Sequence, residues 1–335
     1  MYHSKISGLG YYVPENVVTN DDLSKIMDTN DEWIQERTGI KERRHIIRGE
    51  DTTTSMGVKA AEIAIQRANV AKEDIDFVIF ATLSPDYYFP GPGVLVQRDL
   101  GLRTVGALDV RNQCSGFVYA ISIADQYIKT GMYKNILVIG SEVHSTGLDM
   151  TDRGRGVSVI FGDGAGAAVL SREEDLSKGI LSTHLHSEGQ HAEELSLIAP
   201  GMGKRWVTDI IADNDPNDES YYPYMNGQFV FKNAVVRFSE VINEGLQANN
   251  LQVSDINMLV PHQANLRISQ FIQQKFKLSD EQVYNNIMNY GNTTAASIPI
   301  ALTEAWEQGK IKSGDLVVLA AFGSGFTWGS VIIRW

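Results

Sequence analysis

Three residues far apart in this chain are of the types that a thiol nucleophile and its hydrogen-bonding partners require. Cys114 is the only cysteine among 335 residues. An extended apolar segment at 105–110 runs into it, and a helical apolar pattern leaves it over residues 117–128. Cys114 is therefore predicted at a strand-to-helix turn, where free backbone N–H groups and the helix dipole favour a thiolate. The alternative is an inert thiol that packs as a small hydrophobe.

His262 and Asn292 are the candidate partners of this cysteine. His262 follows the apolar segment 259–260, which has the character of a buried strand, and a helix is predicted after it. Asn292 lies in a loop of small residues, 289–297, that enters another helix. Each residue alone is typical of a structural role, and an asparagine in such a loop commonly serves as a cap or turn residue. Ligands of α/β sheets gather beyond the carboxyl ends of strands, so we expect these side chains to converge.

The elements that must position these residues alternate between strands and helices. Apolar runs at 6–13, 77–81 and 136–140 indicate strands. A capped helix is predicted near Asn20, and a second helix is predicted from Thr52. A short helix is predicted to end at Gly39. This alternation predicts an α/β protein with a mixed or parallel sheet that is covered on both faces.

The chain also resembles itself. Residues 61–79 and 242–260 share a helix-to-strand pattern with an Asp-Ile pair between them, and the strand at 136–139 has a counterpart at 316–319. The sequence FGDG at 161–164 recurs as FGSG at 322–325. We therefore predict two similar halves, 1–172 and 173–335. An insert at about 187–227, rich in Gly, Asp, Asn and Pro, fits neither half and is expected to cover a site or an interface.

Composition and charge limit the class of protein. A formal net charge of −12 argues against a general nucleic-acid binder, and any acidic partner then needs a local basic patch. One cysteine fits a reducing compartment. The first residues lack the apolar core of a signal peptide, and no apolar run approaches the ~20 residues that span a bilayer. We therefore expect a cytoplasmic protein with no membrane contact.

Six motifs, in order along nearly the whole chain, resemble β-ketoacyl-acyl-carrier-protein synthase III, the initiating condensing enzyme of type II fatty-acid synthesis in the thiolase superfamily. They are EWI at 32–34 with RTGI at 37–40, CSGF at 114–117, TDRG at 151–154, PHQAN at 261–265, GNTTAAS at 291–297 and AFGSGFTWG at 321–329. The resemblance implies a duplicated thiolase-like fold, a five-layered αβαβα sandwich, and a homodimer. It identifies the chain as an acyltransferase of lipid metabolism.

The resemblance also implies a mechanism. Cys114 as thiolate attacks an acyl-CoA and forms an acyl-enzyme. Backbone N–H groups of Cys114 and Ser324 form the oxyanion hole. His262 and Asn292 then donate hydrogen bonds to the thioester oxygen of malonyl-acyl carrier protein while carbon dioxide leaves. No metal or redox cofactor is implied.

Further roles follow from the same matching. Coenzyme A binding is assigned to Trp33, Arg37 and Arg153. The acyl pocket is assigned to Phe89, which closes it across the dimer interface, and to Asn112 and Gln113. Docking of the acidic carrier protein is assigned to Lys232, Arg267 and Lys275.

Three departures from the family pattern concern the acyl starter. Asn112 and Gln113 stand where well-known members have alanines, the stretch 151–158 is slightly longer than usual, and so is the insert at 187–227. These differences leave open a related condensing enzyme of specialised metabolism that takes longer or unusual acyl groups. The acyl starter itself, and whether the extender arrives on carrier protein or on coenzyme A, stay open.

Other functions compete with this assignment. A papain-like hydrolase also uses Cys, His and Asn, but its cysteine lies near the mature N-terminus. A thiolase needs a second cysteine, and a hydroxymethylglutaryl-CoA synthase needs a catalytic glutamate, for which only Glu142 and Glu188 offer themselves, outside any known motif. An inactive subunit that binds carrier protein usually loses the nucleophile or its partners, and all three are retained here.

Two further patterns have structural explanations. The pair His184 and His186 could ligate a metal, but only His191 lies nearby as a further ligand, so polar residues at a strand end are the better interpretation. The glycines at 162–166 lack the lysine and spacing of a phosphate loop, and we expect tight backbone packing there.

Overall fold

The first of two large sheets is built from the N-terminal part of the chain. The computed structural model describes residues 2–201, 215 and 217–335. The strand order is β1-β7-β6-β4-β5. Strand β4 runs parallel to β5 and β6, while β7 is antiparallel to both of its neighbours. The strands are β1 (His3–Tyr12), β4 (Phe77–Ala81), β5 (Gly106–Val110), β6 (Asn135–Glu142) and β7 (Gly164–Glu173).

The second large sheet repeats this pattern in the C-terminal part. Its order is β11-β12-β13-β8, with β11 parallel to β12 and the other neighbours antiparallel. Read from the other edge, β8, β13, β12 and β11 correspond in order and direction to β1, β7, β6 and β4. The strands are β8 (Gly179–Ser187), β11 (Met258–Pro261), β12 (Leu316–Gly323) and β13 (Thr327–Arg334).

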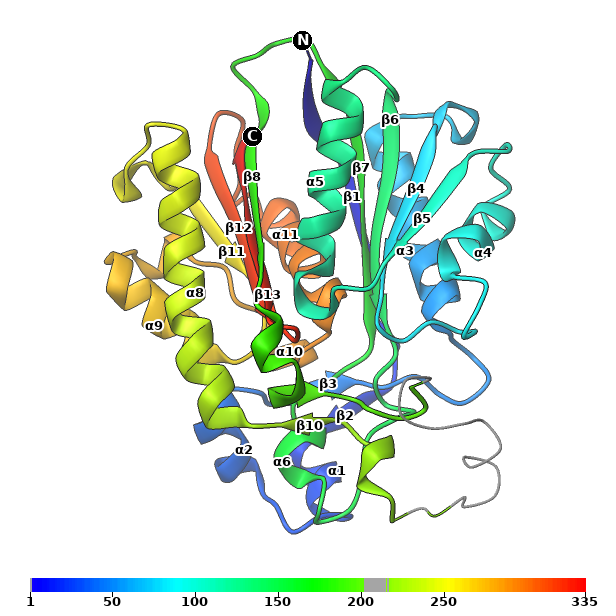
Figure 1. The fold of residues 1–335 in the computed structure, drawn as a ribbon, viewed down its shortest axis with the longest axis vertical. Coiled ribbons are helices and arrows are strands. Elements are labelled where there is room, and N and C mark those ends of the chain that lie inside the picture. The colour runs from blue at the N-terminus through cyan, green and yellow to red at the C-terminus, as the bar shows by residue number, and fades with distance from the viewer. Residues whose placement is uncertain (1, 202–214, 216) are drawn as a thin grey trace.

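Helices and sheets alternate in five layers (Figure 1). Helices α5 and α11 lie between the two sheets, α3 and α4 cover the outer face of the first sheet, and α8 and α9 cover that of the second. The helices are α3 (Thr53–Ala68), α4 (Pro92–Asp99), α5 (Gly116–Lys129), α8 (Gly227–Ala248), α9 (Leu266–Phe276) and α11 (Ser297–Glu307).

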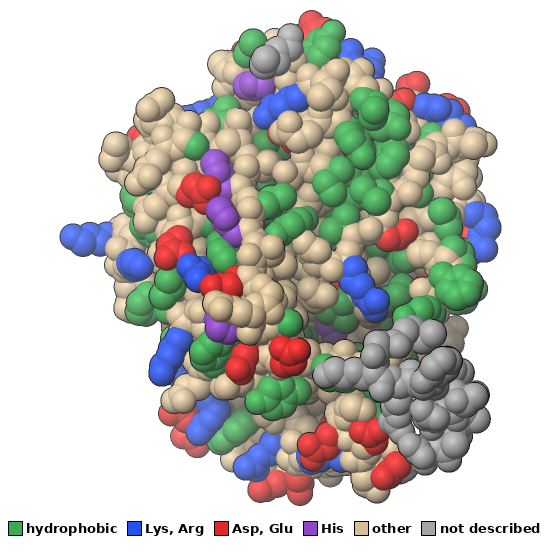
Figure 2. Space-filling view, viewed as in Figure 1, with side chains coloured by type: hydrophobic (Ala, Val, Ile, Leu, Met, Phe, Trp, Pro, Cys, Tyr) green, Lys and Arg blue, Asp and Glu red, His purple; other side chains and the backbone are tan. Residues whose placement is uncertain are grey.

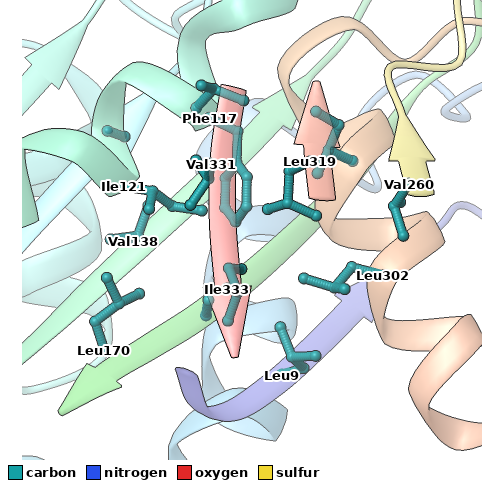
Figure 3. Packing of buried hydrophobic residues seen from close by; sticks show 14 of the residues in the cluster. Leu9, Phe117, Ile121, Val138, Leu170, Val260, Leu302, Leu319, Val331 and Ile333 are labelled. Carbon is teal, nitrogen blue, oxygen red and sulfur yellow. The ribbon is translucent and has the colours of Figure 1, made fainter. Parts of the chain in front are cut away.

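Strands β6 and β12 explain why both faces of each sheet must be covered. All eight residues of each strand are buried. In β6, Ile136 and Val138 face the central helices, and Leu137 and Ile139 face the outer ones. Figure 3 shows the central layer, where Phe117 and Ile121 of α5 meet side chains of both sheets. Continuous apolar strands of this kind are stable only inside a layered structure.

Shorter elements surround the open end of the sandwich. They are β2 (Val17–Thr19), α1 (Asn20–Ser24), α2 (Asp31–Thr38), β3 (Glu42–Arg44), α6 (Arg155–Ser158), β9 (Leu195–Ser196), β10 (Tyr224–Met225) and α10 (Ile287–Tyr290). Gly39 ends α2 with φ +77°, as the sequence predicts. The helix predicted from Thr52 is α3, and the structure shows that the Thr52 hydroxyl caps it. Residues 202–214 and 216 of the predicted insert lie outside the described residues.

Among the described residues, no helix is long and apolar enough to cross a membrane. On the face shown in Figure 2, Lys and Arg side chains are interspersed with acidic ones and do not form a broad basic surface. A general nucleic-acid binder would need such a surface.

Candidate functional site

Cys114 lies at the strand-to-helix turn that the sequence predicts. A short 3-10 turn (Gln113–Ser115) connects β5 to α5, and Gln113 adopts a φ of +42° within it. The turn is anchored by Ser115, whose hydroxyl lies 2.7 Å from that of Thr327 on β13. A Cβ atom on Gly323 would lie 2.5 Å from the Cys114 Cβ and 2.9 Å from its Sγ. Glycine there lets the end of β12 approach the nucleophile.

The expectation that this turn favours a resting thiolate is wrong. Burial, and then the charge of Glu142, raise the pKa of the Cys114 thiol to about 12. The backbone N–H groups of Ser324 and of Cys114 itself act in the opposite direction. Desolvation of a buried thiol therefore exceeds the stabilisation by amides and helix dipole, so the thiol is neutral at rest. The same two N–H groups lie beside the sulfur, and an oxyanion hole would use them for the carbonyl oxygen of a bound acyl group.

His262 directly follows β11 and is buried. Its backbone N–H donates to the Ala320 carbonyl at 2.8 Å, which holds it against β12. Its Nδ1 lies 2.5 Å from the hydroxyl of Ser297 at the start of α11. Its Nε2 is buried and has no hydrogen-bond partner among the described residues. Burial lowers the pKa of His262 to about 3, so the ring is neutral at physiological pH.

Asn292 lies in the loop between α10 and α11 and is tied to the first half of the molecule. Its N–H donates to Ile160 at 2.8 Å, and its carbonyl accepts from Gly162 at 3.1 Å. Its side-chain Oδ1 accepts from the Thr294 N–H at 2.8 Å. With the oxygen occupied, the amide group is left as a hydrogen-bond donor.

A cavity of about 980 Å³ joins these elements. Cys114, Gln113 and Ser324 line it, together with Thr294, which directly contacts Asn292. His262 is connected to the same wall because its partner Ser297 also contacts the Thr294 carbonyl at 3.0 Å. The structure thus places the cysteine on this cavity and links the histidine and the asparagine to it through residues 294–297, which lead into α11.

The predicted insert contributes to the same cavity. Leu195, Leu197 and the stretch 199–201 line it, and so does Pro223. The Ser324 hydroxyl donates to the Leu195 carbonyl, so the insert is attached to the loop that carries one oxyanion N–H. The described part of the insert therefore covers the site, as the sequence predicts.

The three residues assigned to the acyl pocket lie in different surroundings. Gln113 lines the cavity, whereas Asn112 is not among the residues that line it, and its carbonyl accepts the N–H and hydroxyl of Ser115. Phe89 is 82% exposed in the single chain. A side chain of this size that stands in solvent is available to a second copy. Tyr87 and Tyr88 from the same loop line the cavity and were not selected from the sequence.

Two arginine side chains face the ring of Trp33, and only one of them was expected from the sequence. The Arg37 guanidinium lies 4.5 Å from the centre of the Trp33 ring, and that of Arg155 lies 5.6 Å from it. Arg153 instead lies over Tyr222 at 4.8 Å and pairs with Asp149 at 2.5 Å. Arg155 directly follows the TDRG motif at 151–154, and this position could have indicated it from the sequence. A tryptophan between guanidinium groups suits a flat aromatic ligand with phosphates.

The three docking candidates lie on two neighbouring helices. Lys232 is on α8, and Arg267 and Lys275 are on α9. All three are exposed, and none forms an ion pair in the part of the chain that the structure describes. Helices α8 and α9 lie side by side at one edge of the molecule in Figure 1. These side chains are therefore free to meet an acidic partner.

The structure shows the contacts of two further patterns that the sequence contains. His186 lies 2.6 Å from Glu244 and stacks on Trp328, and no group of three or more His, Cys, Asp or Glu within the described ranges could hold a metal ion. The glycines at 162–166 are packed closely, since a Cβ on Gly166 would lie 2.6 Å from Pro299. This is tight backbone packing, as the sequence analysis expects.

Several polar residues around the site were not selected from the sequence. Glu142 at the end of β6 is fully buried and accepts from Ser84 at 2.6 Å and from Thr82 at 3.0 Å. Burial raises the pKa of Glu142 to about 7. His144 lines the cavity and lies 2.6 Å from the Thr294 hydroxyl. Both residues stand at or just after the end of an apolar strand, and this position could have indicated them from the sequence.

Comparison with known proteins gives consistent similarities. Residues 108–189 match the family model for 3-oxoacyl-[acyl-carrier-protein (ACP)] synthase III, and residues 246–335 match the model for its C terminal part. The chain is 44% identical over 334 residues to beta-ketoacyl-[acyl-carrier-protein] synthase III of Sulfurimonas denitrificans, covering 99% of this chain and 98% of that protein. It is 47% identical over 332 residues to the protein of that name from Salmonella paratyphi A, with 99% of each covered.

A solved structure of similar sequence has the same fold. The crystal structure of 3-oxoacyl-[acyl-carrier-protein] synthase III from Aquifex aeolicus superposes with a TM-score of 0.90 at 44% identity. The match covers 99% of this chain and 100% of that one. The thiolase-like fold class is therefore confirmed.

Proposed function

The chain belongs to the β-ketoacyl-[acyl-carrier-protein] synthase III family of condensing acyltransferases in fatty-acid synthesis, and we propose that Cys114, His262 and Asn292 carry its reaction. The observation that supports this most is the position of Cys114 on a large cavity, with the N–H groups of Ser324 and Cys114 beside its sulfur. A purely structural cysteine would have no such access or donors.

The first half of the reaction is acyl transfer. The Cys114 sulfur attacks the thioester carbonyl of an acyl-CoA, the C–S bond to coenzyme A breaks, and the thiol proton passes to the departing sulfur. The products are an acyl-cysteine and free coenzyme A. Because the thiol is protonated at rest, the N–H groups of Cys114 and Ser324 are most useful in the tetrahedral intermediate, where negative charge develops on the carbonyl oxygen.

The second half is decarboxylating condensation. Malonyl-acyl carrier protein loses carbon dioxide, and the electron pair of the broken C–C bond forms an enolate. His262 and Asn292 donate hydrogen bonds to the enolate oxygen, and the carbanion then attacks the acyl-cysteine. Cys114 leaves as thiolate and recovers a proton. A neutral His262 suits this role because it stabilises the oxyanion as a donor in a dry site.

Substrate delivery is assigned to surface residues. Trp33, Arg37 and Arg155 would hold the nucleotide part of coenzyme A, with Arg153 beside them. Lys232, Arg267 and Lys275 would receive the acidic carrier protein. We also propose a homodimer in which Phe89 reaches the partner's acyl pocket, supported by its 82% exposure. The reaction as written needs no metal or redox cofactor, and the single cysteine supports a cytoplasmic location.

The acyl starter is the second question, and the polar side chains Gln113 and His144 on the cavity bear on it. An apolar starter would leave the Gln113 amide without a partner, so Gln113 favours the alternative of an unusual starter that carries a polar group, as an enzyme of specialised metabolism would use. The His144 Nε2 is already bonded to the Thr294 hydroxyl at 2.6 Å and bears less on this choice.

One experiment tests both points. The purified protein is incubated with a panel of acyl-CoAs of different length and polarity, and intact-protein mass spectrometry records the mass added. We expect one acyl group per chain, no addition to Cys114→Ala, and the largest addition from the preferred starter. Acylation that persists in Cys114→Ala would refute the assignment of the nucleophile.

A further inference from the structure

Thr294 has a backbone conformation that a β-branched residue rarely adopts. Its φ is +51°, in the left-handed region, and the residue is 1% exposed. A non-glycine residue in this region is strained, and such residues cluster at functional sites because the surroundings hold them there. Thr294 begins the 3-10 turn (Thr294–Ala296) that leads into α11, and it lines the cavity of Cys114.

The Thr294 N–H decides which way the Asn292 amide faces. It donates to the Asn292 Oδ1 at 2.8 Å. A backbone N–H can only donate, so the side-chain atom that it contacts must be the oxygen. The nitrogen of that amide is then the group that is free to donate elsewhere. The left-handed turn therefore converts Asn292 into a hydrogen-bond donor.

Ser297, one turn further on, acts in the same way on His262. Its hydroxyl lies 2.5 Å from the His262 Nδ1 and accepts from the Gln263 N–H at 3.4 Å. The hydroxyl has two acceptors for its single hydrogen, the Thr294 carbonyl at 3.0 Å and Nδ1 at 2.5 Å. We assign the hydrogen to Nδ1 because that contact is shorter. A neutral ring that accepts at Nδ1 carries its proton at Nε2.

The atom that results from this tautomer is the one without a partner. The Nε2 of His262 is buried and makes no hydrogen bond within the described residues. A buried donor with nothing to bind is costly in a resting protein, and such groups are retained where a ligand supplies the acceptor. An incoming thioester oxygen would be that acceptor.

His144 holds the strained residue from the opposite side. Its Nε2 lies 2.6 Å from the Thr294 hydroxyl. The His144 ring is packed 4.7 Å from that of Phe161, and its backbone N–H donates to Asp163 at 2.6 Å. The backbone of His144 and the face of its ring are thus both held in place. The ring offers Thr294 a polar partner where the cavity would otherwise leave the hydroxyl unpaired.

We propose that Thr294 and Ser297, with His144 behind them, are positioning residues that make both Asn292 and His262 donors for the decarboxylation step. This rests on the proposed function, in which both side chains stabilise an enolate. Thr294 orients the amide through its backbone, and Ser297 selects the tautomer through its hydroxyl. The short segment from Thr294 to Ser297 thus orients both catalytic side chains.

The tautomer is tested first, by NMR of the whole enzyme labelled with ¹⁵N-histidine. Nitrogen shifts distinguish a ring nitrogen that carries a proton from one that does not, and the signals of His262 are assigned by their loss in His262→Ala. We expect the proton on Nε2 in the native protein and a mixture of tautomers in Ser297→Ala. A proton on Nδ1 in the native protein would overturn the proposal.

Kinetics test the consequence. Acyl loading of Cys114 and release of carbon dioxide from malonyl-acyl carrier protein are measured separately. We expect Ser297→Ala to slow carbon dioxide release about tenfold to a hundredfold, with loading within about threefold of native. Thr303→Val, which removes another buried hydroxyl of α11 bonded to Pro299 at 2.6 Å, is the matched control and should change neither rate beyond about threefold. Equal carbon dioxide release in Ser297→Ala and the control would overturn the proposal.

His144 is tested by a rescue. His144→Leu removes the partner of Thr294, whereas His144→Gln can place a polar atom near the position of Nε2. We expect carbon dioxide release to fall about threefold to tenfold in the leucine variant and to recover in the glutamine variant. Equal losses in both variants would contradict a hydrogen-bonding role for His144. Failure of the native enzyme to load Cys114 at all would instead refute the proposed function, so the two failures are distinguishable.

Discussion

The two large sheets place different residues at the same strand end. Thr82 follows β4 in the first sheet, and His262 follows the corresponding strand β11 in the second. The Thr82 hydroxyl donates to the buried carboxylate of Glu142 at 3.0 Å, whereas the Nε2 of His262 has no partner in the described part of the chain. A polar group whose bonding is complete supports structure, and one that is left open can act on a ligand.

The repeated FGxG sequences differ in the same manner. A Cβ on Gly162 in the first half would clash with the backbone carbonyl of Tyr290, while one on Gly323 in the second would meet the side chain of Cys114. In both places glycine permits close approach. In one place it serves the packing of two loops, and in the other it brings an oxyanion loop to the nucleophile.

The largest effect on the reaction is expected from the comparison of His262 with Thr82, which follow corresponding strands. His262→Ala should slow release of carbon dioxide by at least about a hundredfold, because a donor to the enolate is lost. Thr82→Val should leave that rate within about threefold and lower the free energy of unfolding by about 1–3 kcal/mol, since Glu142 loses a buried hydrogen bond. The rate is measured as carbon dioxide release, and the free energy of unfolding is measured by urea denaturation. Similar kinetic losses in both variants would contradict the comparison.

The two glycines give the next largest contrast. Gly323→Ala should slow acyl loading at least about tenfold, because the Cβ and Sγ of Cys114 must move. Gly162→Ala should destabilise the fold by about 1–3 kcal/mol, because a backbone carbonyl cannot move away easily. Mass spectrometry of the acyl-enzyme and thermal denaturation check these outcomes. A Gly323→Ala enzyme that loads at the native rate would show that the approach of β12 is unimportant.

The thiol should respond to pH and to Glu142. With a pKa of about 12, the rate of Cys114 alkylation by iodoacetamide should rise about tenfold per pH unit from pH 7 to 10. Glu142→Gln removes a negative charge, lowers the pKa of the thiol and should raise the rate at pH 8 several-fold, about threefold to tenfold. A plateau in the native protein below pH 9 would contradict a thiol that is neutral at rest.

A smaller effect concerns stability in acid. Burial lowers the pKa of His262 to about 3 and that of His144 to about 4. Below about pH 6.5 the unfolded chain binds protons that the folded one does not, so stability should fall by up to about 1.4 kcal/mol per pH unit for each histidine. His144→Gln should have a shallower slope of unfolding free energy against pH between 6 and 4.5. An unchanged slope would mean that His144 is protonated in the folded protein.

Much of the local structure was predictable because its signals are local. The start of α3 near Thr52, the end of α2 at Gly39 and the turn at Cys114 each depend on a few adjacent residues. The order of motifs also predicted the residues of the site. Arg155 over Trp33, the strained Thr294 and the contact between His144 and Thr294 could not be predicted this way, because each depends on a partner brought near by folding.

The amino-acid sequence by itself determined which groups are available and at which strand and helix ends they stand, since periodicity, capping residues and turn chemistry operate over a few positions. Only the tertiary structure decided the state of those groups. Burial made Cys114 a neutral thiol and His262 a neutral imidazole, and the turn from Thr294 to Ser297 set their neighbours. Desolvation and hydrogen-bond direction depend on surroundings that distant segments build together.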